Sequence, residues 1–152
     1  MVETLEAAVA RFDADVPDWA VAEALNAPDA SLPTKRVKVP VSVVRSLYLA
    51  RGFWGAIVRI AADSTKPDAL RDLCTLTRDT CTLLTEISTD DPVIYARAVA
   101  SADALLGAGL IDQATRNDVV ALADAVSSWA DLNNGGVAVT ARDVGLARGG
   151  VA

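Results

Sequence analysis

The stretch from Asp91 to Gly136 reads DPVIYARAVASADALLGAGLIDQATRNDVVALADAVSSWADLNNGG, and it decides the fold class. Asp91 followed by Pro92 is a helix start, because an acidic cap and a first-turn proline both suit the amino end of a helix. The Gly-Ala-Gly run at 107–109 ends this helix, Asp112 caps the next one, and Asn-Asn-Gly-Gly at 133–136 stops it. Apolar residues between these ends keep spacings of three and four, at Tyr95, Val99, Ala102 and Leu106 and then at Val119, Leu122, Val126 and Trp129. Two amphipathic helices in succession indicate an all-α protein.

The same combination of caps and apolar spacing recurs on both sides of this stretch. It predicts helices over residues 2–12, 17–26, 42–61 and 64–87. Thr140 with Asp143 resembles a capping box, which predicts a short last helix to Arg148. We therefore expect a compact bundle of about six to seven helices, folded as a single domain over residues 1–152.

The predicted helices carry predicted buried faces. In helix 17–26 the face is Trp19, Ala22 and Leu25, and in helix 64–87 it is Leu73, Leu76, Thr80, Leu83 and Ile87. All three tryptophans, Trp19, Trp54 and Trp129, lie on such faces, so we assign them to core packing before any ligand role.

Two pairs of residues inside these helices allow more than one interpretation. Gly52 and Gly55 either mark a kink or let another backbone approach closely, and we favour close packing. Cys74 and Cys81 are seven residues apart, too far along one helix for a disulfide, so we expect two reduced core thiols.

The segment from Asp29 to Pro40 differs from the rest of the chain and predicts an extended arm. It contains Pro33, a basic cluster and alternating valines. A single strand needs a partner, so the arm either lies across the helices or pairs with something outside the chain. The candidate partner-binding residues are Lys35, Arg36, Val37, Lys38 and Val39.

Composition argues against several classes of function. The 152 residues are 52% hydrophobic and carry a net charge of -6, which argues against a sequence-independent grip on nucleic acid. No run of about eighteen uncharged apolar residues is present, so no membrane span is expected. Glu3 and Glu6 occupy the region where a signal peptide has positive charge, so we expect a cytoplasmic protein.

The absence of histidine removes the commonest general base and zinc ligand, which leaves Asp or Cys chemistry. Asp90 and Asp91 precede Pro92 and are accounted for by helix capping. A further three aspartates recur every six residues and do not share one helical face, at Asp112, Asp118 and Asp124. No glycine-rich phosphate loop is present. We therefore expect no catalytic residues, no metal site, no cofactor and no small-molecule substrate.

Two stretches carry a family resemblance. They are DWAVAEALNAP at residues 18–28 and GLIDQATRNDVVALADAVSSWADLNNGGVAVTARDVGLAR at residues 109–148. Together they resemble small, mostly uncharacterised helical proteins encoded among the late or virion genes of tailed bacteriophages. The shared features are a short helix with an Asn-Ala-Pro stop, a GLI-D turn, a Trp-Ala near a helix end and a terminal VTxxDVxxAR. These motifs cover about a third of the chain, consist largely of caps and apolar faces, and carry no catalytic or binding residue across.

The resemblance implies a non-enzymatic structural or assembly protein of the virion, from the tail or neck. Its partners are expected to be other virion proteins or copies of itself. It is then expected in the cytoplasm of the producing cell and afterwards in the virion. The alternatives are an intracellular binding or regulatory module and, third, a small enzyme using Asp or Cys.

Overall fold

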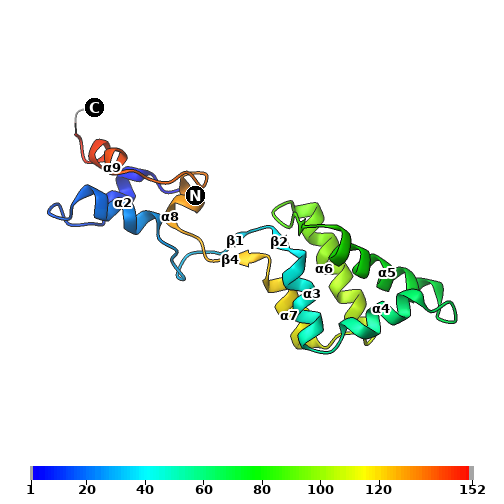
Figure 1. Ribbon diagram of the computed structural model, residues 1–152. Coiled ribbons are helices and arrows are strands. Elements are labelled where there is room, and N and C mark those ends of the chain that lie inside the picture. Colours follow the sequence, from blue (N-terminus) through cyan, green and yellow to red (C-terminus); the bar gives the residue numbers. More distant parts are fainter. Residues whose placement is uncertain (1, 151–152) are drawn as a thin grey trace. The chain divides into compact units, whose positions relative to one another are not determined.

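The computed structural model describes residues 2–150, and Figure 1 shows their path. In this range the chain is mostly helical, as the sequence predicts, with nine helices and four two-residue strands. The helices are α1 (Leu5–Val9), α2 (Asp18–Asn26), α3 (Val41–Ala50), α4 (Trp54–Ala62), α5 (Asp68–Leu83), α6 (Pro92–Gly107), α7 (Gln113–Ala121), α8 (Trp129–Asn133) and α9 (Ala141–Ala147). The strands are β1 (Lys35–Arg36), β2 (Val39–Pro40), β3 (Glu86–Ile87) and β4 (Asp124–Ala125).

The described residues divide into two compact units. Unit 1 contains residues up to 35 and from 125 onward, and unit 2 contains residues 36–124. The buried apolar residues form two separate clusters, one in each unit, where the sequence favours a single interior. The single domain over residues 1–152 stays a prediction. It requires the two units to unfold together in one cooperative transition.

Unit 1 is built from both ends of the chain. In it α2 packs against α8 and α9, and α1 packs against α9. The core contains Val21, Trp129 and Val144. The Asn26 side chain bonds both backbone groups of Val139, accepting from its N–H at 2.8 Å and donating to its carbonyl at 2.7 Å. Segments far apart in sequence therefore share one interior.

Unit 2 is a continuous segment of five helices, α3 to α7. Its most extensive helix contact is between α4 and α5, and α6 packs against both α5 and α7. The core includes Ile57, Cys74 and Leu105, which are almost fully buried. Both cysteines are buried and free, as predicted.

The predicted arm, Asp29 to Pro40, lies along the chain's own elements. β1 pairs with β4, and β2 pairs antiparallel with β3, with Val39 opposite Ile87. The two alternatives for this segment were a position across the helices and pairing outside the chain. Both of its strands pair with strands of the same chain. The sequence does not predict β3 and β4, because two-residue strands have no alternating pattern of their own.

The predicted helix over residues 42–61 is two helices, and our preference for close packing at its glycines is wrong. The axes of α3 and α4 differ by 101°. Gly52 has φ of +80°, and a Cβ added there meets nothing within 4 Å. The N–H of Phe53 donates to the carbonyl of Tyr48 and that of Gly52 to Leu49, which together form a Schellman motif. Gly52 is therefore needed for its backbone conformation.

Helix α5 ends at Leu83, before the predicted Ile87, and its predicted buried face is right only in part, since Leu73 packs partly buried against the core. Cys74, Thr77 and Cys81 point into the core, whereas Leu76 and Leu83 are 57% and 77% exposed. Both the face with the leucines and the face with the cysteines have spacings of three and four. The prediction chose the leucine face because leucine is the more hydrophobic residue.

Three other predictions need correction. The first helix covers Leu5–Val9 instead of residues 2–12, because Thr4 caps it. Trp19 is 63% exposed, since Val21, Ala22 and Leu25 form the buried face of α2. The predicted helix after Asp112 is interrupted by β4, and Ser128 with Asp131 forms a capping box that starts α8.

No single helix among residues 2–150 has the length and apolar character to cross a membrane. The bent pair α3 and α4 meets those two criteria only jointly.

The positive φ at Gly52 generates a prediction with an internal control. Gly52→Ala should lower the free energy of unfolding by about 1–2 kcal/mol, because a side chain is strained in the left-handed region. Gly55, in α4, lacks a positive φ, and a Cβ there meets only the end of Arg59 at 3.9 Å. Gly55→Ala should raise stability by about 0.5 kcal/mol. Urea denaturation measures both, and equal effects would contradict the assignment.

Candidate functional site

The three cations among the five residues predicted to bind a partner are each paired within the chain. Lys35 pairs with Asp131 at 2.8 Å, Arg36 with Asp124 at 2.9 Å, and Lys38 with Glu86 at 3.2 Å. Each cation of the basic cluster therefore has an acidic partner on a different element.

The two valines of this segment are also engaged within the chain. The N–H of Val37 donates to the carbonyl of Ala123 at 2.8 Å, and the Thr89 hydroxyl donates to the carbonyl of Val37. Val39 is buried in the core of unit 2. These contacts account for the segment by folding alone, and a partner contact through Lys35 to Val39 stays a prediction.

The aspartates considered for chemistry have separate structural roles. Asp91 caps α6, accepting from the N–H groups of Val93 and Ile94. Asp112 caps α7, while Asp118 pairs with Arg51 and Asp124 with Arg36. Within residues 2–150 no three His, Cys, Asp or Glu side chains come together in a group that could hold a metal ion.

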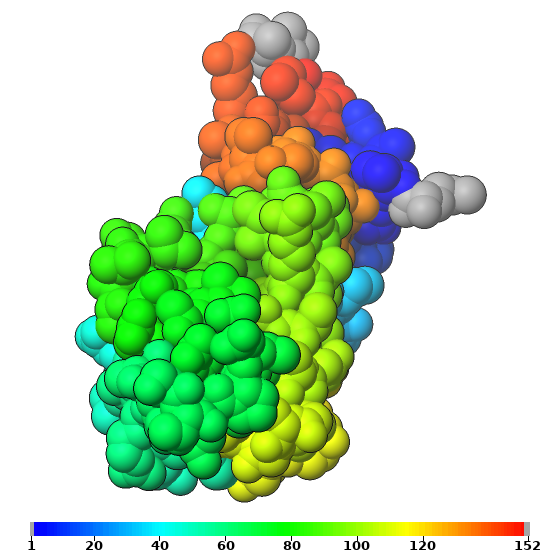
Figure 2. Space-filling model, turned by 90° about the vertical axis from the view of Figure 1, so that its right-hand side faces the viewer, coloured from blue at the N-terminus to red at the C-terminus, as the bar shows by residue number. Residues whose placement is uncertain are grey.

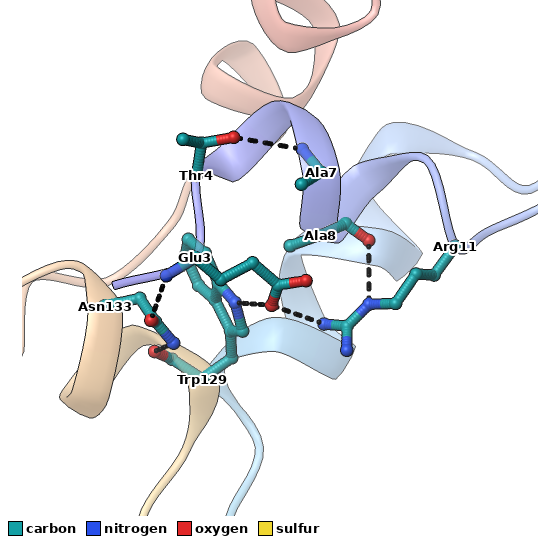
Figure 3. A network of polar contacts seen from close by, with 7 residues as sticks. All are labelled: Glu3, Thr4, Ala7, Ala8, Arg11, Trp129 and Asn133. Carbon is teal, nitrogen blue, oxygen red and sulfur yellow. Dashed lines mark hydrogen bonds and ion pairs between the residues drawn. The ribbon is translucent and has the colours of Figure 1, made fainter. Parts of the chain in front are cut away.

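A polar network in unit 1 ties the N-terminal segment to α8 (Figure 3). The indole N–H of Trp129 donates to the Glu3 carboxylate at 2.7 Å, and Arg11 pairs with the same oxygen at 3.2 Å. The backbone N–H of Glu3 donates to Asn133 at 2.8 Å. Trp129 is buried as predicted, and its single polar atom is satisfied by a residue 126 positions away. This network joins the N-terminal segment to α8 within unit 1.

A cleft in unit 2 has a volume of about 500 Å³. We call it the α5–α6 cleft, because residues of these two helices form most of its lining. Its interior is lined by buried residues that include Val39 of β2, Tyr48 of α3 and Ala123, which follows the end of α7. The exposed lining residues Leu76, Leu84 and Ile94 mark its mouth. Its volume falls within the range of ordinary binding pockets.

The buried lining of the cleft is largely apolar and includes two titratable side chains, Tyr48 and Cys81. Burial, with the neighbouring Cys81 thiol adding to it, raises the pKa of Tyr48 to about 12. Burial raises the pKa of Cys81 to about 11, and the positive charge of Arg45 opposes the shift. Both groups are therefore protonated near neutral pH, and a protonated thiol is a poor nucleophile.

The mouth of the cleft carries one charged lining residue, Arg97. No carboxylate lines the cleft. Arg97 has no ion-pair partner among the described residues, whereas seven other arginines pair with an acid. A second guanidinium, that of Arg36, lies 3.5 Å from the centre of the Tyr95 ring, which also lines the cleft. The cleft thus offers apolar surface and positive charge, which is chemistry for binding.

The sequence does not predict this cleft, because the apolar spacing in α5 assigns Leu76 and Leu83 to the core. The sequence does contain one indication of the buried face, because Cys74, Thr77 and Cys81 also recur at spacings of three and four along this helix. Taking that face as buried leaves the leucines on the outside, beside the apolar first turn of α6.

The Lys35–Asp131 pair predicts a pH dependence for unit 1. The hydrogen bond from Lys35, with two from Ser128, lowers the pKa of Asp131 to about 2. A carboxyl whose pKa is lower in the folded than in the unfolded state stabilises above its unfolded pKa, near 4. That contribution should be lost as pH falls from about 4 to about 2.

Asp131→Asn should flatten the dependence of the melting temperature on pH in this interval, since Asn keeps the capping oxygen without the charge. Asp15→Asn, at an exposed site in the same unit, is the control. Thermal denaturation followed by circular dichroism measures the change, and an unaltered slope in Asp131→Asn would contradict the role of the pair.

The high pKa of Cys81 predicts a slow thiol. In a Cys74→Ser variant, iodoacetamide should alkylate Cys81 at pH 8 at least roughly 100-fold more slowly than a thiol of ordinary pKa, because the thiolate is that much rarer. The rate should rise about tenfold per pH unit up to pH 10. Mass spectrometry of timed samples measures it, and a rate equal to that of free cysteine would refute the assignment.

Comparisons with family models, with curated proteins and with solved structures find no match to this chain.

Proposed function

We propose that this chain is a non-enzymatic structural or assembly protein of a tailed-phage virion, acting at the tail or neck through protein-protein contacts. The phage assignment is supported by the sequence resemblance alone. The mode of action is supported by one structural observation, the exposed apolar surface at the mouth of the α5–α6 cleft.

Several large apolar side chains on the lining of the cleft or next to it in sequence are exposed. On α5 and just beyond it, Leu76, Leu83 and Leu84 are 57%, 77% and 52% exposed, and on α6 Val93 is 61% exposed. Single exposed apolar residues are ordinary, but a contiguous group beside a cavity marks an interaction site. Covering such side chains stabilises a complex by roughly 25 cal/mol per Å² of apolar area removed from water.

The chemistry of the described residues is also consistent with binding. Near neutral pH the cleft holds a protonated thiol and a protonated phenol, without a carboxylate beside them. General acid-base catalysis needs a group that titrates near the working pH. A contact function makes no such demand.

The proposal is tested in phage particles. The chain should be found by mass spectrometry in purified virions or in assembly intermediates. A Leu83→Ser/Leu84→Ser variant should fold with unchanged helical content and lose incorporation, because it removes apolar surface only from the mouth of the cleft. The matched control is Leu49→Ser, whose side chain is 53% exposed on α3 and does not line the cleft.

Two outcomes would count against the proposal. Absence of the wild-type chain from both particles and intermediates would exclude a virion role. Incorporation of the double variant at the level of the control would exclude the cleft as the contact surface.

The second candidate is an intracellular module that binds one phage or host protein. The size of the cleft favours it, because a volume of about 500 Å³ lies in the range of pockets that enclose a single bound group. A stable one-to-one complex without higher assembly distinguishes this function from a virion component.

A further inference from the structure

The α5–α6 cleft combines a hollow with an apolar rim that extends beyond it. Leu76, Leu84 and Ile94 line the hollow and reach the surface. Leu83 and Val93 do not line it and are more exposed still. A small apolar molecule inside the hollow would leave these two side chains in water. An occupant that covers them must be longer than the hollow itself.

The elements around the cleft favour a helical occupant. Two helices, α5 and α6, form the sides of the cleft and pack against each other. Figure 2 shows the face of unit 2 on which the green atoms of α5 and the yellow-green atoms of α6 lie. A groove between helices accepts the apolar face of an amphipathic helix, whose anchors recur every three or four residues.

The charge of the cleft indicates what the occupant carries. Arg97 is exposed at the lining, has no acidic partner among the described residues, and no carboxylate lines the cleft. An acidic side chain of the occupant next to Arg97 gains an ion pair without competing with one inside the chain.

A second copy of this chain fits the same surface less well. A twofold contact places identical patches against each other. Here it brings together two surfaces that both contain Arg97 and both lack a lining carboxylate. The charge favours a different protein over a self-contact.

We infer that the α5–α6 cleft binds an amphipathic helix of another protein, with apolar anchors at helical spacing and an acidic residue opposite Arg97. This inference deepens the proposed function and rests on it for the nature of the contact. It is tested on the isolated full-length chain, so its failure is separate from failure of the virion assignment.

The experiment selects binders from a random library of 16-residue peptides displayed on their own messenger RNA, with the full-length chain as target. The best binders are synthesised with a fluorescein label and titrated by fluorescence anisotropy. Ala98→Phe, which fills the cleft from α6, should abolish binding, and Leu84→Ser should weaken it. Both variants are checked for helical content by circular dichroism.

Charge is tested separately. Arg97→Glu should weaken binding about tenfold, because attraction of the acidic residue becomes repulsion near the protein surface. Arg142→Glu makes the same change at an exposed arginine of unit 1 and should leave binding unchanged. A peptide with its acidic residues replaced by glutamine should bind equally to wild type and to Arg97→Glu.

The expected result is a set of peptides with apolar residues at i, i+3 or i+4, and i+7, at least one acid, and sensitivity to Ala98→Phe. Peptides without that periodicity, or insensitive to both Ala98→Phe and Arg97→Glu, would overturn the inference. Binding of dodecanoate in the cleft without any selected peptide would overturn it in favour of a small amphiphile. Concentration-dependent dimerisation abolished by Leu84→Ser would overturn it in favour of a second copy.

Discussion

Unit 1 forms only when the two ends of the chain meet, and the paired hydrogen bonds between Asn26 and Val139 show how they do so. The two residues are 113 positions apart, and the Asn26 amide satisfies both backbone groups of Val139. A backbone N–H and carbonyl left unpaired inside a protein would each cost free energy comparable to a lost hydrogen bond. Unit 2 is therefore inserted into a unit whose own closure depends on long-range contacts.

Other contacts in unit 1 also join the N-terminal and C-terminal parts of the chain. Arg148 donates to the carbonyls of Asp13 and Val16 and pairs with Asp18, so one guanidinium joins the end of α9 to the turn before α2. Ser127 donates to the carbonyl of Pro33 at 2.5 Å. Each of these joins a residue after 124 to one before 36. The short helices of this unit are held by tertiary contacts, since helices of five to nine residues are marginal alone.

Local features of the structure could be predicted from the sequence, and features that depend on burial could not. The caps at Asp91, Asp112 and Thr140 were predicted correctly, because a cap involves only residues two or three positions away. The face of α5 and the exposure of Trp19 were not, because apolar spacing alone does not tell which of two faces meets the core. The candidate site was missed for the same reason, since the pattern assigned Leu76, at the mouth of the cleft, and Leu83, beside it, to the interior. The Lys35 to Lys38 cations were recognised as unusual, but their acidic partners lie 48 to 96 residues away.

The insertion of unit 2 also determines whether this segment can be replaced by another one. Its first and last residues, Arg36 and Asp124, are held together by a 2.9 Å ion pair, and the next residues inward, Val37 and Ala123, share a backbone hydrogen bond. A segment whose ends lie side by side can be exchanged for another of different length without stretching the chain that receives it. The ends of residues 36–124 thus have the geometry at which a whole segment can be exchanged while unit 1 keeps its own contacts.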